Sequence, residues 1–487
     1  MPLRPFSRCQ TWLFPPTLEE LIPEDHPARF VGAFVDALDR ATWAELGIGL
    51  DGEVLGSPAY HPRALLSVWL YGFMTGTRSS RKLEAACRDE LPYLWLTGWQ
   101  HPDHNTLWRF YREHREAMRH LFKGTVHAAV KVGLVDLAVQ AVDGTKMAGN
   151  AATDRTYDKE GLQKLLERTE KAIRELEDQN ETGNDPPPPH LPKKLTQAQQ
   201  LLAEVKAAVD EMAENGKKRI NLTDGDSGLM KGRHGVVAGY NLQAVVSPIE
   251  DTRANEAGLL ITAAEVVQDK NDVAQLVPMP DQAEETTGRR AEVSLADAGY
   301  HSGYNLEVCE QQHQVVVMPE GQERAVRLPY DKDKFTYDAA GDCYICPLGQ
   351  ALRFAGIRQT EGKVRRLYRA CGATCRKCVA FGICTRDRRR GRELEVGPYD
   401  AVLRRHRDWM ATKEAKMAYR RRRQISEPVF GIIREQMGVR RFLLRGLAEV
   451  RAEAKLLATA FNLRTLYRIW QRWSHERRII LIRALAR

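Results

Sequence analysis

Three acidic residues occupy positions from which they could bind metal ions together. Asp143 follows one segment of strand-like alternation, and Asp297 follows another. Glu427 directly precedes Pro428, and because proline favours the first helical position, we expect Glu427 at the start of a helix. Carboxylates fixed on rigid elements can share two Mg²⁺ or Mn²⁺ ions about 3.5–4 Å apart, as two-metal phosphoryl transfer requires. The three acids therefore predict metal-dependent chemistry on phosphodiester bonds.

Each acid, taken singly, also has a structural explanation. Aspartate before glycine is common in turns after strands, and the helix dipole favours glutamate in a first helical turn. The order and spacing of the three acids, rather than any one of them, favour the catalytic interpretation. Arg434 follows Glu427 by seven residues, which predicts that it lies on the same helix face, two turns along.

The elements expected to hold these acids alternate between strands and helices. Strand-like segments lie at residues 135–142, 239–246, 258–264, 291–296 and 314–318, and a helical segment at 269–286 precedes the fourth of them. This order predicts an α/β core built from residues 135–150, 219–322 and 401–465. Apolar residues at helical spacing on both sides of four prolines predict a helical hairpin at 151–218, to which we assign no chemistry.

Residues 1–134 have the pattern of a helical region. Helices are expected at 61–75, 79–89 and 105–121, and the third would bury Leu107 and Tyr111 while turning Arg109 and Arg112 outward. A short helix, a turn and a second helix with outward arginines resembles a helix-turn-helix, so both arginines are predicted to contact DNA. Any small helical bundle gives the same pattern, which leaves a purely structural interpretation open.

Positive charge gathers in the second half of the chain. The formal net charge is +9, and residues 386–390 and 420–423 are arginine-rich runs. Seven arginines lie from Arg464 onward, and a basic C-terminal helix is predicted at 466–487. Lysine and arginine displace counterions from phosphates, so several such runs favour a nucleic-acid partner over a merely solvated face. No apolar run reaches the roughly 18 residues of a membrane helix and no apolar signal segment is seen, so we expect a cytoplasmic, nucleoid-associated protein.

Six of the nine cysteines fall in one window, within a predicted insertion at residues 323–400. They are Cys343, Cys346, Cys371, Cys375, Cys378 and Cys384. The Cys-x-x-Cys pairs 343/346 and 375/378 have the spacing of zinc ligands, and disulfides are not expected in a cytosolic protein. These four cysteines are therefore predicted to bind Zn²⁺, with an iron–sulfur cluster as the alternative.

Four short stretches resemble the DDE transposases of bacterial insertion sequences. They are Val-Asp-Gly-Thr-Lys at 142–146, Gly-Tyr-Asn-Leu-Gln-Ala at 239–244, Ala-Asp-Ala-Gly-Tyr-His-Ser at 296–302 and Ser-Glu-Pro-Val-Phe-Gly at 426–431, and the segments at 440–446 and 461–463 also resemble the family. The resemblance implies a ribonuclease H-like core in which Asp143, Asp297 and Glu427 bind Mg²⁺. It also implies cleavage at the DNA ends of a mobile element, strand transfer into target DNA, and a dimer or larger assembly on DNA.

The resemblance further implies a tyrosine–arginine–glutamate–lysine signature around the third acid. Tyr419, Arg423, Glu427 and Arg434 fill it, with arginine in place of lysine and the tyrosine one residue further back than usual. His301, after the second acid, is a further candidate DNA contact. Two other functions stay open: a catalytically inactive or domesticated DNA-binding relative, and a nuclease that cuts without joining.

Overall fold

The chain forms two compact units in a computed structural model. The structure describes residues 16–50, 59–181, 193–232, 235–251, 256–321, 329–360, 363–387 and 389–485. The first unit contains Met1–Asp272, Pro278–Glu292 and Arg422–Arg487, and the second contains Val273–Val277 and Val293–Arg421. The four prolines of the hairpin linker and one arginine of the run at 386–390 lie outside the described residues.

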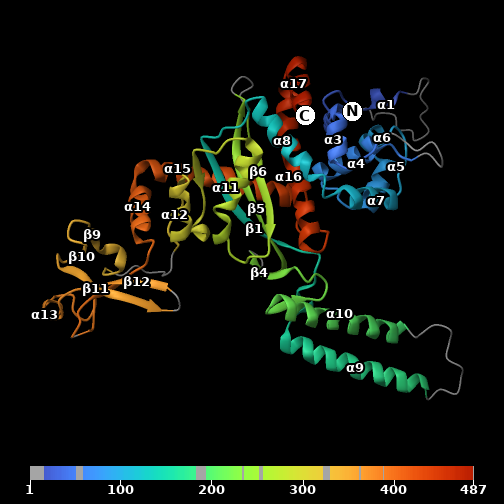
Figure 1. The fold of residues 1–487 in the computed structure, drawn as a ribbon. Coiled ribbons are helices and arrows are strands. Elements are labelled where there is room, and N and C mark those ends of the chain that lie inside the picture. Colours follow the sequence, from blue (N-terminus) through green and yellow to red (C-terminus); the bar gives the residue numbers. More distant parts are fainter. Residues whose placement is uncertain are drawn as a thin grey trace, which may run out of the picture. The chain divides into compact units, whose positions relative to one another are not determined.

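The N-terminal part of the first unit is helical, as predicted (Figure 1). The helix expected at 61–75 is α4, which has His61 as its N-cap and ends at Gly76 with a positive φ of 87°. The helix expected at 79–89 is α5. In chain order, the helices of this part are α1 (Leu18–Leu21), α2 (Pro27–Ala37), α3 (Arg40–Glu45), α4 (Pro62–Thr75), α5 (Ser80–Asp89), α6 (Leu91–Thr97), α7 (His104–His114) and α8 (Arg119–Lys131).

The single helix predicted at 105–121 is wrong, because the chain turns after α7 and starts again as α8. At the turn, the Arg115 guanidinium binds Glu449 and the carbonyl of Arg112. The turn lets Leu107 and Tyr111 pack in the N-terminal helices while Leu121 is buried on α8, which packs against α16. α6, a short helix between α5 and α7, was not predicted from the sequence.

An antiparallel sheet lies at the centre of the first unit. Its strands are β1 (Val139–Ala148), β4 (Gly228–Gly232), β5 (Gly235–Asp251) and β6 (Glu256–Val267), and β5 pairs with all of the others. β5 is buried continuously from Ala238 to Ile249, the pattern of a central strand covered on both faces. Helices α11 (Pro278–Thr287) and α16 (Leu447–Arg472) pack on β6 (Figure 1). The helix expected at 269–286 is α11, which begins only at Pro278.

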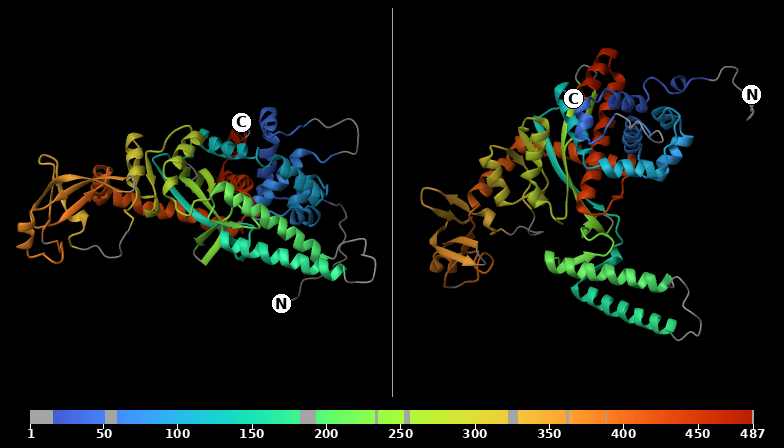
Figure 2. Two further views of the ribbon diagram at one scale, coloured as in Figure 1. Left: turned by 60° about the horizontal axis from the view of Figure 1, so that its bottom comes forward. Right: turned by 45° about the vertical axis from the view of Figure 1, so that its right-hand side comes forward.

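The predicted helical hairpin consists of α9 (Lys159–Glu181) and α10 (Lys193–Asn215). The two helices lie side by side in every view (Figures 1 and 2) and share a small core that includes Leu162, Val205 and Met212. The short strands β2 (Thr156–Asp158) and β3 (Arg219–Asn221) pair at its base and close the insertion. The hairpin thus has its own apolar core.

The C-terminal helices complete the first unit. α15 (Lys413–Gly431) is followed by a π-helical turn at Ile432–Gln436, by α16 and by α17 (His475–Leu485). The predicted boundary at 466 therefore falls inside α16. Glu453 of α16 is buried, accepts hydrogen bonds from the backbone N–H groups of Leu443 and Leu444, and is paired with Arg78 at 2.6 Å. Burial raises the pKa of Glu453.

Several arginines of the basic C-terminal segment serve the fold instead of a ligand. Arg464 donates to the carbonyl of Met74, Arg477 pairs with Asp251, and Arg478 donates to the carbonyl of Trp470. Their guanidinium groups bind carbonyl and carboxylate oxygens of the same unit. The count of arginines after Arg464 therefore overstates the charge available to DNA.

The second unit contains a short parallel strand pair and a separate antiparallel sheet. β7 (Val293–Leu295) pairs in parallel with β8 (Val315–Val317), and α12 (Gly303–Gln311) packs against α14 (Asp400–Ala411). The sheet has the order β13-β12-β11-β10-β9. Its elements are β9 (Thr336–Asp338), β10 (Cys343–Ile345), β11 (Ala351–Thr360), β12 (Lys363–Arg369) and β13 (Glu393–Val396), with α13 (Gly372–Arg376) between the last two strands.

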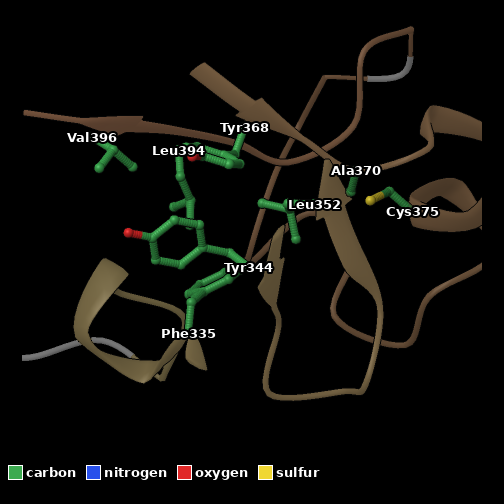
Figure 3. Close-up of a cluster of buried hydrophobic side chains, with 8 residues drawn as sticks. All are labelled: Phe335, Tyr344, Leu352, Tyr368, Ala370, Cys375, Leu394 and Val396. Carbon is green, nitrogen blue, oxygen red and sulfur yellow. The ribbon is translucent and has the colours of Figure 1, made fainter. Parts of the chain in front are cut away.

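An aromatic and aliphatic core holds this small sheet together. Figure 3 shows Tyr344, Tyr368 and Leu352 packed with Cys375 of α13 and other buried side chains. The whole chain is thus mixed α/β, as predicted. Among the described residues, no helix is long and apolar enough to cross a membrane.

Candidate active site

Asp143 lies in the middle of β1. The prediction that it ends a strand is wrong, because β1 continues to Ala148 and Asp143 is paired with Ala244 of β5. Gly144 does not make a turn there. A Cβ atom on Gly144 would lie 2.2 Å from Nε2 of Gln243, so the glycine is needed for the close approach of that side chain.

Arg422 of α15 is the partner of Asp143. Its Nη1 donates to Oδ2 of Asp143 at 3.1 Å and to Oγ of Ser426 at 3.3 Å, and the side chains of Arg422 and Asp143 are only 12% and 15% exposed. The signature predicted from the sequence contains the neighbouring Arg423. Arg422 is three residues after Tyr419 and five before Glu427, whereas Arg423 is four residues from each, so the spacing does not single out Arg422.

Glu427 lies on the same helix, one turn beyond Arg423. Its side chain is 51% exposed, and Nε of Arg423, itself 82% exposed, lies 3.9 Å from Oε1 of Glu427. The Asp143–Arg422 contact joins the strand of the first acid to the helix of the third. Within the first unit, α15 therefore holds Arg422 against Asp143, and the same helix carries Glu427 and Arg423.

The prediction that Glu427 begins a helix is wrong. α15 starts at Lys413 and contains Pro428 in its interior, where proline cannot donate to the carbonyl of Gln424. Ile425, Val429 and Phe430 are buried around this position, and their packing outweighs a cost of about 3 kcal/mol for an interior proline. A π-helical turn follows at once, so the spacing from Glu427 to Arg434 is not that of a regular helix.

Arg434 binds β1 close to Asp143. Its Nη2 donates to the hydroxyl of Thr145, and lies 3.4 Å from the carbonyl oxygen of Lys146. Because alternate residues of a strand face the same side, Thr145 and Asp143 share one face of β1. Arg434 and Arg422 thus approach the face of β1 that carries the first acid.

The opposite face of β1 carries a polar network that sequence reasoning missed. Asp272 accepts from Nζ of Lys146 at 2.9 Å, from Nδ2 of Asn241 at 2.7 Å and from Nε2 of Gln243 at 2.6 Å. Asn241 and Gln243 are fully buried, two residues apart on β5. That spacing was the available signal, because two polar residues on one face of a buried strand need a partner. The network fixes the register of β1 beside Asp143.

We predict that Gly144→Ala disrupts this network. The new methyl group would displace the Gln243 amide and leave buried polar groups unsatisfied, which costs about 1–3 kcal/mol of unfolding free energy. Gly124→Ala in α8 is the matched control, since its nearest neighbour would be the carbonyl of Leu485 at 3.7 Å, an ordinary contact. Denaturant unfolding should show a loss for Gly144→Ala and a gain of about 0.5–1 kcal/mol for Gly124→Ala. Equal stability of the two variants would contradict this role of Gly144.

Asp297 belongs to the second unit, where it follows β7 by two residues. It is the N-cap of the short 3-10 helix Ala298–Tyr300, and its Oδ1 accepts from the backbone N–H of Gly299 at 2.7 Å. The expectation that this acid follows a strand is confirmed. Asp143 and Glu427 belong to the first unit, so the predicted triad draws on both units.

His301 faces a charged cavity of the second unit. The cavity, of about 560 Å³, is also lined by Glu320, Lys332, Asp400 and Arg404 among others. The ring of His301 lies 6.0 Å from that of His406, whose pKa is lowered by burial.

Tyr419, the predicted tyrosine of the signature around Glu427, is half-buried on α15.

Arg109 and Arg112 are exposed on α7, as predicted. The buried side of the helix carries Leu107, Phe110 and Tyr111. The side chains of the two arginines are therefore accessible to a partner. The predicted DNA contact itself stays a prediction.

The four cysteines predicted to bind zinc do not line one cavity. Cys346, Cys375 and Cys378 line a small cavity together with Cys384, whereas Cys343 is not among its lining residues. Cys343 lies on β10, with its sulfur 4.0 Å from Oδ2 of Asp338. Cys346 directly follows β10 and begins the turn that leads to Gln350, where its N–H donates to the carbonyl of Gln350 at 2.9 Å.

The oxygen donors of the acidic residues fit a hard divalent ion. Asp143, Asp297 and Glu427 offer carboxylate oxygens, the ligands that Mg²⁺ prefers. In the part of the chain that the structure describes, no three His, Cys, Asp or Glu side chains lie at the spacing of metal ligands. Oδ2 of Asp143 is paired with the Arg422 guanidinium at 3.1 Å.

Two protein-family models match the chain. The family described as Transposase domain (DUF772) matches residues 16–113, and the family described as Transposase DDE domain matches residues 345–467. The first match contains Arg109 and Arg112, and the second contains Glu427 and Arg434. No curated protein and no solved structure matches the chain. The two matches confirm the relationship to the DDE-type transposases of insertion sequences.

Proposed function

We propose that the chain is an active transposase that binds the ends of an insertion sequence, cuts them and joins them to target DNA. One observation carries this proposal: the helix that holds Glu427, inside the match to the Transposase DDE domain, is joined to Asp143 through Arg422. A ribonuclease H-like core would hold Asp143, Asp297 and Glu427 around two Mg²⁺ or Mn²⁺ ions. When bound, these ions would activate the attacking water or 3′ hydroxyl and neutralise charge on the leaving oxygen.

The chain's own residues would bind and orient the DNA. Arg423 and Arg434 flank Glu427, and guanidinium groups bind phosphate oxygens in a bidentate manner. Arg422 would hold Asp143 in place before the ions bind and then yield its position. Arg109 and Arg112 on α7 would contact the element ends, and Tyr419 and His301 would contact DNA near the acids. Because two ends must be joined, the protein would act as a dimer or larger assembly.

A plasmid carrying the gene with its natural flanking DNA tests this proposal. Incubation with the purified full chain and Mg²⁺ or Mn²⁺ should give cuts on both sides of the gene, with free 3′ hydroxyl ends, and joined products in a second plasmid. Chelation of the metal should abolish both. DNA binding without metal-dependent cuts would indicate an inactive relative, and cuts without joined products would indicate a nuclease without strand transfer.

A further inference from the structure

Four cysteines of the second unit surround one small cavity. Cys346, Cys375, Cys378 and Cys384 all line it, together with apolar residues such as Leu352, Ala370 and Phe381. Its volume is about 30 Å³, which suits one ion or water molecule and excludes an organic ligand. A cavity lined by four thiols among apolar groups offers soft ligands and few competing oxygen donors.

The backbone around these cysteines forms tight turns whose N–H groups point at sulfur. After Cys346, a turn through Gly349, with a positive φ of 79°, brings the N–H of Gln350 to 3.2 Å from Sγ of Cys346. The N–H of Ala380 lies 3.4 Å from Sγ of Cys378. Both turns therefore already direct backbone N–H groups at the sulfur atoms that line the cavity.

Local geometry separates the four cysteines from the two others in the same window. Cys375 ends the turn of α13 and Cys378 follows it by three residues, a spacing that places both on one side of a helical turn. Cys384 returns to this turn, where its N–H donates to the carbonyl of Ala380 at 2.9 Å. Cys371 is exposed at the start of α13, and Cys343 packs beside Asp338. In Figure 3, the Cys375 sulfur points from α13 toward Ala370.

Arg392 supplies a positive charge at the same cavity. Its guanidinium donates to the carbonyl of Cys384 and to that of Tyr330, both at 3.0 Å. Its Nε is buried and has no hydrogen-bond partner among the residues that the structure describes. A thiolate cluster would supply both the acceptor and the negative charge that this buried donor lacks.

We infer that Cys346, Cys375, Cys378 and Cys384 bind one structural Zn²⁺ ion. The four thiols would bind as thiolates and release up to four protons, with Zn–S bonds of about 2.3 Å in a tetrahedral arrangement. The described side chains do not yet stand at ligand spacing, so side-chain rotation into the cavity accompanies binding. The ion would join β10, α13 and the turn at Cys384 without taking part in DNA cleavage, so this inference is independent of the proposed function.

Metal analysis and thiol footprinting of the wild-type full chain test the site directly. Elemental analysis should find about one zinc per chain and little iron. Alkylation followed by mass spectrometry should leave Cys346, Cys375, Cys378 and Cys384 unmodified until a chelator removes the metal. Cys371, which is exposed, should be alkylated in both conditions and serves as the internal control.

Paired variants then distinguish this ligand set from the pairing of Cys343 with Cys346. Cys384→Ser should lower the zinc content at least several-fold, whereas Cys343→Ser should retain about one zinc per chain. If Cys384→Ser fails to fold, the footprint of Cys384 in the wild-type protein decides the same point. Zinc-free wild-type protein, iron with visible absorbance, or retention of zinc in folded Cys384→Ser would each overturn the assignment.

Discussion

Asp143→Asn, Asp297→Asn and Glu427→Gln should each reduce metal-dependent DNA cleavage by several orders of magnitude. An amide oxygen is a neutral and weaker ligand than a carboxylate, and loss of one ligand removes the activated nucleophile. Asparagine at 143 can still accept a hydrogen bond from Arg422, so the contact between β1 and α15 should survive. Single-turnover cleavage of the flanked plasmid, measured beside DNA affinity, checks the result.

Two controls make this test specific for metal binding. Glu414→Gln changes an exposed glutamate on the same helix as Glu427 and should leave cleavage unchanged. Asp143→Cys should be inactive with Mg²⁺ but partly active with Mn²⁺, since a softer ion accepts a thiolate ligand more readily. A variant of the triad that cleaves at nearly the wild-type rate would remove its residue from the proposed site.

The place of the acids could be predicted from the sequence more safely than their local structure. Segments of clear alternation gave the strands around Asp143 and Asp297, and the strand before Asp297 ends as expected. Gly144 and Pro428 were misleading because glycine after aspartate usually follows the end of a strand, and proline usually stands at the beginning of a helix. In the structure, Gly144 makes room for Gln243 and Pro428 is held inside α15 by buried neighbours. Such tertiary causes leave no local trace in the sequence.

The two Cys-x-x-Cys pairs illustrate the same limit. Their spacing is identical, but 375/378 lies at a helical turn and 343/346 begins on a strand. Both cysteines of the first pair line the small cavity, whereas only Cys346 of the second pair does. Spacing alone therefore could not identify Cys384 as the fourth member of the cluster.

Positive charge was equally hard to assign from the sequence. The four arginines at 420–423 look equivalent, yet three are exposed and Arg422 is turned toward Asp143. The difference arises because a helix carries successive residues around its axis, and only one of the four can face β1. Charge counts predict a polyanionic partner, whereas the division between structural and accessible arginines needs the fold.

Arg434→Ala should lower single-turnover cleavage by about 10²-fold or more while changing DNA affinity far less. A donor beside the scissile phosphate stabilises charge that grows in the transition state, and loss of one such donor costs about 10²–10³ in rate.

Alanine at both Arg109 and Arg112 should lower DNA affinity much more than the rate of cleavage. Loss of two phosphate contacts should weaken binding and reduce the slope of log affinity against log salt concentration by about two. The rate of cleavage of pre-bound DNA should be retained.

A matched variant separates the catalytic role of Arg434 from a bracing role. Arg434 also ties the π-helical turn to β1 through the hydroxyl of Thr145. Thr145→Val removes that hydroxyl and keeps a β-branched side chain suited to a strand. If Arg434 acts on the phosphate, Thr145→Val should cost little, and Arg434→Lys should retain only part of the rate because lysine lacks the bidentate fork. If Thr145→Val lost as much cleavage as Arg434→Ala, the role of Arg434 would be to hold β1 in place, and the phosphate contact would have to come from a residue other than Arg434.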